Sequence, residues 1–262
     1  MNRINKAREA YRNQDSEALA AAHSPDAIAN SINHTEGHKT DFNLPEIILG
    51  GQDGLVNVLG VILGVAAAST NNSIVIVAGL AAAFAESISM AAVAYTSKIA
   101  EVDYYQSELE REAYEIEHMP DAERIEIREL YKSCGFEGNL LDQVVATITS
   151  NKKVWLRTMM EQELKLEPVN RKEALPAAFV VGVSALVGSF IPLTPFFLLS
   201  RQGGIVAALV ISSLTLFGVG YYKAQKTLGR QLIRAGIEMM VIGMVSALVG
   251  YFIGSLFKVP SL

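Results

Sequence analysis

Cysteine is nearly absent from this chain of 262 residues, since Cys134 is the only one. A single cysteine excludes an internal disulfide framework and any zinc site built from several thiolates. An apolar run is also missing from residues 1–40, so we expect no signal peptide there. The chain therefore belongs neither to the disulfide-rich proteins nor to the proteins that are stabilised by cysteine-bound zinc.

Charge is absent from two long segments. Residues 174–200 and 202–222 contain no Asp, Glu, Lys or Arg. A helix of about 20 apolar residues crosses the hydrocarbon layer of a membrane, so a wholly soluble enzyme does not fit this sequence. The apolar segments also lack the alternation of a membrane β-barrel. The sequence predicts an all-α, polytopic membrane protein with five transmembrane helices, at about residues 45–69, 73–97, 173–199, 204–222 and 235–257.

The formal net charge of −5 is unevenly distributed. Residues 101–175 hold 17 of the 27 acids and 10 of the 22 bases, a local net charge of −7, whereas the rest of the chain carries +2. This acidic insert lies between the second and third predicted spans. Its charge disfavours nucleic acid as a partner and suits a cationic ligand, although acidic surfaces also serve solubility.

The chain divides into a polar N-terminal segment over residues 1–43, two transmembrane helices over 44–98, an acidic helical insert over 99–172, and three transmembrane helices over 173–262. Lysine and arginine gather in the N-terminal segment and in residues 223–234. Because such residues mark the cytoplasmic side of a membrane protein, we expect the N-terminus and the insert in the cytoplasm. The C-terminus is expected on the opposite side.

The polar N-terminal segment predicts one helix over residues 5–22, ended by the Ser-Pro-Asp sequence at 24–26. It also carries His23, His34 and His38. Their spacing fits no compact ligand motif. A metal-binding tail and a solvated tail both remain open.

Carboxyl groups well inside the first two predicted spans are candidate functional residues, whereas Glu238, near the start of the fifth span, is expected at the membrane interface. Asp53 lies about two turns inside the first span, and Glu86 lies in the second, with Met90 one turn later on the same helical face. Acids in hydrocarbon usually face a pore or a partner, the alternative being a structural hydrogen bond or a neutral acid. Carboxylate oxygen suits Mn²⁺ and Fe²⁺, and a thioether adds a softer ligand. Since metal binding requires the ionised acid, these residues predict an exchange of protons for metal.

The insert is predicted to form three helices, over about residues 97–117, 120–133 and 141–166, with a break near Ser150. Pairs of glutamates with i, i+3 spacing lie on each side of the first turn, so four carboxylates are predicted to converge. A solvated acidic face is the alternative, because such pairs are common on charged helices. The candidate metal ligands are Glu112, Glu115, Glu123, Glu126, Met159, Met160 and Glu163.

A further motif in the insert has the spacing of a di-iron carboxylate site. Glu115 and His118 form a Glu-x-x-His sequence. A di-iron site needs a second such motif and two further glutamates. Only a dimer would supply the second motif here, so this interpretation stays an alternative.

Three motifs together resemble the vacuolar iron transporter family, over about residues 42–257. The first is Ile-Leu-Gly-Gly-Gln-Asp-Gly-Leu-Val at residues 48–56, and the second is Ala-Glu-Ser-Ile-Ser-Met at 85–90. The third is Trp-x-x-x-Met-Met-x-x-Glu at residues 155–163. Residues 1–41 have no counterpart that we identify in the family.

The resemblance implies five transmembrane helices per subunit, a homodimer and a transport path between the subunits. It implies exchange of Fe²⁺, and often Mn²⁺, for protons, by a transporter that is not an enzyme and carries no prosthetic group. By matching position it places Asp53, Glu86 and Met90 on the metal path. It assigns the seven candidate ligands of the insert to a cytoplasmic metal-binding domain.

Two classes of function are therefore expected. The first is export of Fe²⁺ or Mn²⁺ from the cytoplasm by proton antiport. The alternative is a membrane-anchored metal-binding or di-iron oxidase protein whose insert is the functional part, or a metal sensor without a transport cycle. Carboxylate–thioether sites discriminate weakly among divalent metals, so the sequence does not select among Fe²⁺, Mn²⁺, Co²⁺, Ni²⁺ and Zn²⁺. It also fits both the plasma membrane and an intracellular membrane.

Overall fold

The structure, a computed structural model, describes residues 3–28, 44–227 and 231–257. These residues form helices joined by short connections, and the described ranges contain no strand. Five of the helices are long and apolar enough to cross a membrane. The predicted all-α fold class with five membrane helices is therefore confirmed. These helices are α4 (Leu44–Ala68), α5 (Asn72–His118), α9 (Ala174–Leu198), α10 (Arg201–Thr227) and α11 (Leu232–Leu256).

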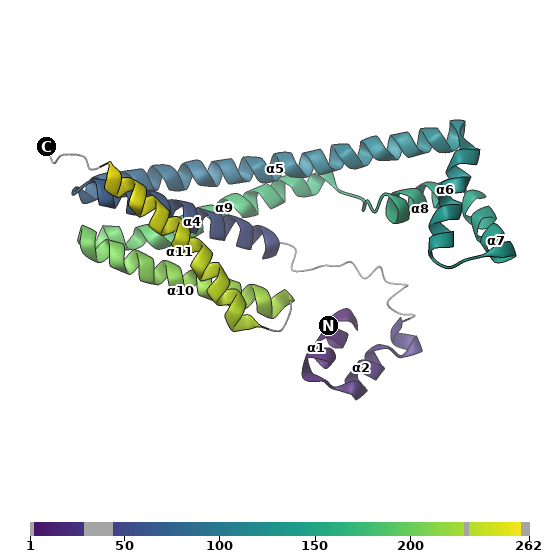
Figure 1. Ribbon diagram of the computed structural model, residues 1–262, viewed down its shortest axis with the longest axis horizontal. Helices are drawn as coiled ribbons and strands as arrows, with labels where there is room; N and C mark the ends of the chain where they lie inside the picture. Colours follow the sequence, from purple (N-terminus) through teal and green to yellow (C-terminus); the bar gives the residue numbers. More distant parts are fainter. Residues whose placement is uncertain (1–2, 29–43, 228–230, 258–262) are drawn as a thin grey trace. The chain divides into compact units, whose positions relative to one another are not determined.

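The chain divides into two compact units. The first contains residues 1–91 and 179–262, and the second contains residues 92–178. The insert predicted at residues 99–172 lies within the second unit. Helix α5 runs without a break through residue 91, so its first part belongs to the first unit and its last part to the second (Figure 1). At 1.5 Å per residue its 47 residues extend over about 70 Å, more than twice the thickness of a hydrocarbon layer.

Helix α4 is the centre of the first unit because its glycines let two neighbours approach closely. A Cβ atom at Gly54 would collide with the carbonyl oxygen of Ala185 on α9. Further along, a Cβ at Gly64 would lie 2.9 Å from the carbonyl oxygen of Gly250 on α11. A Cβ at Gly254 would in turn collide with the Gly64 carbonyl. Small residues at spacings of four therefore set the helix contacts, as in many membrane bundles.

The apolar core of this unit lies along the same helix. Leu59 and Ile62 of α4 are completely buried, and they pack in one cluster with Phe196 of α9. Large apolar side chains elsewhere point outward, among them Ile88 and Phe179, which are each 70% exposed. An outward apolar surface on a helix bundle is what contact with lipid requires, since the backbone groups are already satisfied within each helix.

The second unit folds the end of α5 against three shorter helices and a π-helix. Its core contains Ile116 of α5, Ile127 of α6, Leu141 of α7, Trp155 of α8 and Met159 of the π-helix. Helix α6 begins and ends at the two residues predicted for the second helix of the insert. The elements are α6 (Pro120–Ser133), α7 (Gly138–Thr149), α8 (Lys152–Thr158) and the π-helix Met159–Glu163 (Figure 1).

The third predicted helix of the insert, over residues 141–166, differs from the structure in three ways. The first helical segment begins earlier, at Gly138. The chain then breaks at Ser150, as expected, because the Asn151 side chain caps the next helix by accepting hydrogen bonds from the backbone N–H groups of Lys153 and Val154. Finally, the last turn widens into the π-helix, which the sequence pattern does not reveal.

The single helix predicted over residues 5–22 is wrong. The structure has α1 (Arg3–Asn13) and α2 (Ser16–Ala22), separated at Gln14, whose φ is 54°. The Asp15 carboxylate caps α2 by accepting hydrogen bonds from the N–H groups of Glu17 and Ala18, which favours a new helix start over continuation. His23 Nδ1 lies 2.8 Å from the carbonyl oxygen of Leu19. The other candidate histidines of this segment, His34 and His38, lie outside the described residues.

Candidate metal centre

The insert brings three glutamates together where α5 turns into α6. One carboxylate oxygen each from Glu112, Glu115 and Glu123 lies within 4.8 Å of the others. The turn that joins the two helices is tight, because the N–H of Met119 donates to the carbonyl of Glu115 over 2.7 Å. Pro120 then begins α6 without losing a hydrogen bond, since the first N–H groups of a helix have no partner within it.

Two of these carboxylates are buried and incompletely paired. Glu112 is 1% exposed and Glu123 is 3% exposed. The Oε2 atom of each has no hydrogen-bond partner among the described residues. A buried carboxylate oxygen without a partner is costly, so such a pair needs either protons or a cation to compensate it. A donor set of three carboxylates that could hold one ion fits a divalent cation such as Mn²⁺, Mg²⁺ or Ca²⁺.

The carboxyls of Glu123 and Glu163 have pKa values close to neutral pH, so a substantial fraction of each is protonated there. Burial, followed by the charges of Glu126 and Glu112, raises the pKa of each to about 7. For Glu163, a hydrogen bond with the Glu126 carboxyl raises the pKa further. Glu126 is therefore connected to the cluster by its hydrogen bond with Glu163, and its carboxylate is not among the three that converge. A metal ion entering this site at neutral pH has to displace protons.

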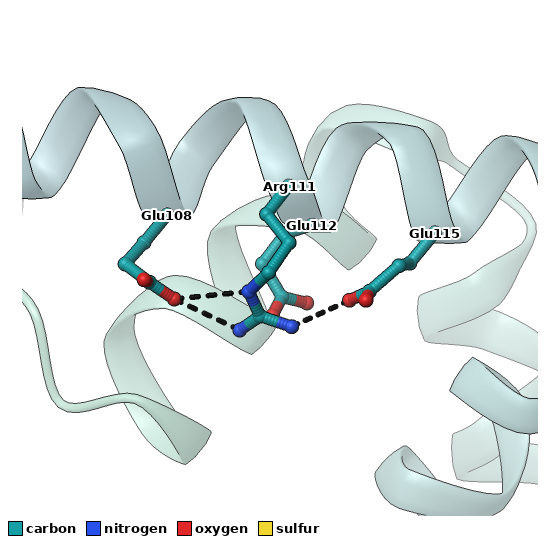
Figure 2. Close-up of polar contacts among 4 residues, drawn as sticks. All are labelled: Glu108, Arg111, Glu112 and Glu115. Atoms are coloured by element: carbon teal, nitrogen blue, oxygen red, sulfur yellow. Dashed lines mark hydrogen bonds and ion pairs between the residues drawn. The ribbon is translucent and has the colours of Figure 1, made fainter.

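An arginine that the sequence prediction missed lies among these acids. Figure 2 shows the Arg111 guanidinium between the carboxylates of Glu108 and Glu115, with Glu112 beside it. Its Nη1 lies 2.6 Å from Glu115, and its Nη2 lies 2.6 Å from Glu112 and 2.9 Å from Glu108. The spacing of i−3 and i+4 to two glutamates on one helix is the signal that would have found it.

The two predicted methionine ligands are both buried. Met159 is completely buried and packs in the apolar core of the insert with Trp155 and Ile127. Met160 is 1% exposed. Both begin the π-helix, in which the N–H of Leu164 reaches back five residues to the carbonyl of Met159. Such π-helical turns occur often at functional sites. The packing of Met159 alone accounts for its burial, so a ligand role for the two thioethers stays a prediction.

The Glu-x-x-His alternative gains no support from this geometry. The His118 ring stacks on Tyr114 with the ring centres 3.9 Å apart, and its Nδ1 lies 2.9 Å from the Tyr114 carbonyl oxygen. Within the described part of the chain, the group of converging carboxylates does not include this histidine. The imidazole is therefore engaged with its own helix rather than with the glutamates.

A second group of polar side chains lies between α4 and α5, inside the predicted membrane spans. The Glu86 carboxyl lies within hydrogen-bonding reach of Asp53 and of Asn57. Asp53 and Glu86 are both half-buried, and Met90 follows one turn later on α5 with similar exposure. A hydrogen bond between two carboxyl groups requires that one of them carries a proton.

Two residues near this pair were not predicted as site residues. Asn57 lies one turn after Asp53 on α4, and Glu46 lies two turns before it on the same helical face. The Oε2 atom of Glu46 is buried without a hydrogen-bond partner in the described ranges. The helical spacing from Asp53 would have identified both, since one face of α4 presents all three side chains.

A membrane bundle of five helices with a carboxyl pair between its first two spans, joined to an insert of clustered glutamates, defines a class of cation-handling membrane proteins. Comparison with known families specifies it further. The model of the VIT family matches residues 44–255, which is most of the chain, and the protein belongs to this family.

Relatives share about a third of their residues with this chain. Vacuolar iron transporter 1 of Arabidopsis thaliana is 35% identical over 82% of this chain and 86% of its own length. The vacuolar iron transporter of Plasmodium falciparum is 32% identical over 97% of this chain and 96% of its own length. This second alignment extends beyond the family match into the N-terminal segment. The expectation that residues 1–41 have no counterpart is therefore wrong for this relative.

Proposed function

We propose that this protein moves Fe²⁺, with Mn²⁺ as a second candidate substrate, out of the cytoplasm in exchange for protons. Membership of the VIT family and the names of its iron-transporting relatives support iron as the transported ion. The observation that carries the mechanism is the contact of Asp53 and Glu86 between two apolar helices. Two acids at this depth are costly unless they serve a path or a partner.

The carboxyl pair supplies a means of exchange. When the pair shares a proton, the two groups together carry one negative charge. A divalent cation that binds both carboxylates requires this shared proton to leave, because coordination needs the ionised form. Met90, one turn from Glu86, adds a thioether that favours a transition metal over Ca²⁺ or Mg²⁺. Release of the metal and return of the proton restore the pair.

The insert is proposed to collect the metal before transport. Its candidate ligands are the clustered Glu112, Glu115 and Glu123, with Glu126 and Glu163 beside them. The two methionines at 159 and 160 complete the predicted set. A site of several carboxylates binds divalent ions without strong selectivity, which suits a collector that hands its ion onward.

The remaining features of the proposal follow from the family and from the charge pattern. We infer a homodimer with the insert and the N-terminus in the cytoplasm and the C-terminus across the membrane. The protein needs no prosthetic group for transport and is not an enzyme in this proposal. The oxidase alternative is disfavoured, because a passive membrane anchor has no use for Asp53 and Glu86, and because His118 lies apart from the glutamates.

A flux assay in proteoliposomes tests the function. The purified protein is reconstituted with a pH-sensitive dye inside the vesicles, and Fe²⁺ under reducing conditions, Mn²⁺, Co²⁺, Ni²⁺ and Zn²⁺ are added in turn, with and without an imposed pH gradient. Wild-type protein should couple metal uptake to proton movement, and Asp53→Ala should abolish both. Normal flux in Asp53→Ala would exclude the proposed path, and oxygen consumption on addition of Fe²⁺ would favour the oxidase.

A further inference from the structure

We propose that Arg111 is a built-in competitor for the metal site of the insert: its guanidinium occupies the carboxylates when no metal is bound and must leave them when metal enters. This proposal rests on the proposed metal-collecting role of the insert. In this role Arg111 is not a metal ligand. It controls how tightly, and for how long, the insert holds the ion.

The contacts of Arg111 overlap with the candidate ligand set. Two of the three converging carboxylates, those of Glu112 and Glu115, each lie 2.6 Å from a guanidinium nitrogen. A cation that bound one oxygen from each of the three glutamates would meet these same side chains. Two positive charges cannot share a carboxylate oxygen without repulsion, so the guanidinium and a divalent ion compete for the group.

Glu108, which is not one of the three converging glutamates, can keep Arg111 nearby after its guanidinium has left Glu112 and Glu115. Glu108 accepts hydrogen bonds from both Nε and Nη2 of Arg111, over 3.1 and 2.9 Å. This two-point contact ends on a single oxygen, Oε2 of Glu108, and it is charge-assisted, which makes it stronger than a neutral hydrogen bond. The Arg111 side chain is 45% exposed, so it has open space into which it can move. It can therefore release Glu112 and Glu115 while it stays paired with Glu108.

The other oxygens of the cluster show why an incoming ion still finds a site. Glu112 Oε2 and Glu123 Oε2 have no partner among the described residues, and both side chains are more than nine-tenths buried. These two oxygens offer a first contact for a metal ion. Displacement of Arg111 then frees Glu115 and the second oxygen of Glu112. The return of the guanidinium favours release of the ion, which a collector that passes metal onward requires.

Metal binding by charge-matched variants tests this role. The full-length protein in detergent is titrated with Mn²⁺ at pH 8, well above the pKa of about 7 of the neighbouring glutamates, and dissociation is followed after a chelator is added. Arg111→Gln should bind Mn²⁺ about tenfold more tightly and release it correspondingly more slowly, because a competing positive charge is removed. Arg111→Lys keeps the charge but loses the two-point contact with Glu108, so its affinity should fall between those of the wild type and Arg111→Gln.

The matched control is Arg128→Gln. Arg128 also pairs with a carboxylate of the insert, Asp142, but within the described residues it forms no ion pair with the clustered glutamates. Arg128→Gln changes the net charge by the same amount as Arg111→Gln. Equal Mn²⁺ affinities of the two variants would show that only the overall charge matters, and would overturn the proposal. Weaker binding by Arg111→Gln would also overturn it, because Arg111 would then orient the ligands rather than compete. If wild-type protein binds no Mn²⁺ at the insert, the proposed collecting role itself fails.

Discussion

Asp53 of α4 and Glu86 of α5 lie within hydrogen-bonding reach of each other between two apolar helices. Sequence separates them by more than thirty residues, and the short connection between the helices brings them together. The contact joins two acids at a depth where a single unpaired carboxylate would be costly. In the proposed function, this contact couples proton loss and metal binding at one place.

The first prediction concerns the protons released by this pair. Glu86→Gln leaves an amide that can still hydrogen-bond Asp53 but cannot lose a proton. We expect the variant to release about one proton fewer per metal bound at the membrane site. Calorimetric titration in buffers of different ionisation enthalpy measures this number. To separate the two sites, the titration uses a background in which Glu112 and Glu123 are both replaced by Gln. An unchanged proton count would place the exchange elsewhere.

The second prediction concerns the carboxylates of the insert. Replacing Glu112 and Glu123 together with glutamine should weaken metal binding to the insert by roughly 10–100-fold or more, because two buried charged ligands are lost. The double variant Glu117→Gln, Glu129→Gln has the same change in charge, and both of its residues are exposed and paired with lysines. Binding of Mn²⁺ to full-length protein compares the two. Equal affinities in both double variants would remove Glu112 and Glu123 from the ligand set.

The third prediction concerns the stability of the metal-free insert as a function of pH. The pKa of Glu123 is about 7 in the folded protein, against 4.5 as its ordinary value. Between these values the folded state binds more protons than the unfolded state, so stability should decrease as pH rises from about 4.5 to 7. Glu163 has the same sign and range. The free energy of unfolding of the insert is therefore expected to be higher at pH 5 than at pH 8.

Trp155 provides the measurement. It is the only tryptophan of the chain, and it is 3% exposed in the core of the insert. Its fluorescence therefore reports unfolding of the insert within the full-length protein in detergent. Glu123→Gln should flatten the pH dependence and stabilise the metal-free protein at pH 8. A slope of the opposite sign in the wild type would contradict the assigned burial of these carboxyls.

The fourth prediction concerns helix packing in the membrane unit. A Cβ at Gly254 of α11 would collide with the backbone of Gly64 on α4, so Gly254→Ala should destabilise the bundle by about 1–3 kcal/mol. The control is Gly218→Ala on α10, where no atom lies within 4 Å of the added Cβ. That variant should be neutral or slightly stabilising, because alanine favours a helix over glycine. Thermal unfolding in detergent, followed by circular dichroism, compares the two. Equal melting temperatures would argue against the close contact of α4 and α11.

The membrane helices were predictable because their cause is local. An uncharged segment such as residues 174–200 determines a span by its own composition, and α9 lies where this run predicts it. The same is true of α6, which proline begins and a Ser-Cys-Gly sequence ends. The helix break at Gln14 was missed, since it depends on a left-handed residue and on the Asp15 cap rather than on hydrophobic pattern.

The candidate site was only partly predictable for a related reason. Helical spacing identified Glu112, Glu115 and Glu123, because the turn between α5 and α6 folds two acidic faces together. Spacing along one helix does not show which positively charged group pairs with those acids. Arg111 was therefore overlooked, although it lies next to Glu112 in the sequence. Nor does it distinguish a thioether that binds metal from one that fills a core, as with Met159.

The π-helix Met159–Glu163 has a consequence for how this segment can vary in length. Each residue of an α-helix turns the chain by about 100°, and a π-turn accommodates one additional residue. In genetic terms, the segment is equivalent to an α-helical turn that has gained one codon. Loss of one codon within the turn would therefore restore a regular helix and close the widened turn that begins at Met159 and Met160. The length of this segment can change by one residue while the chain that follows it keeps nearly the same direction.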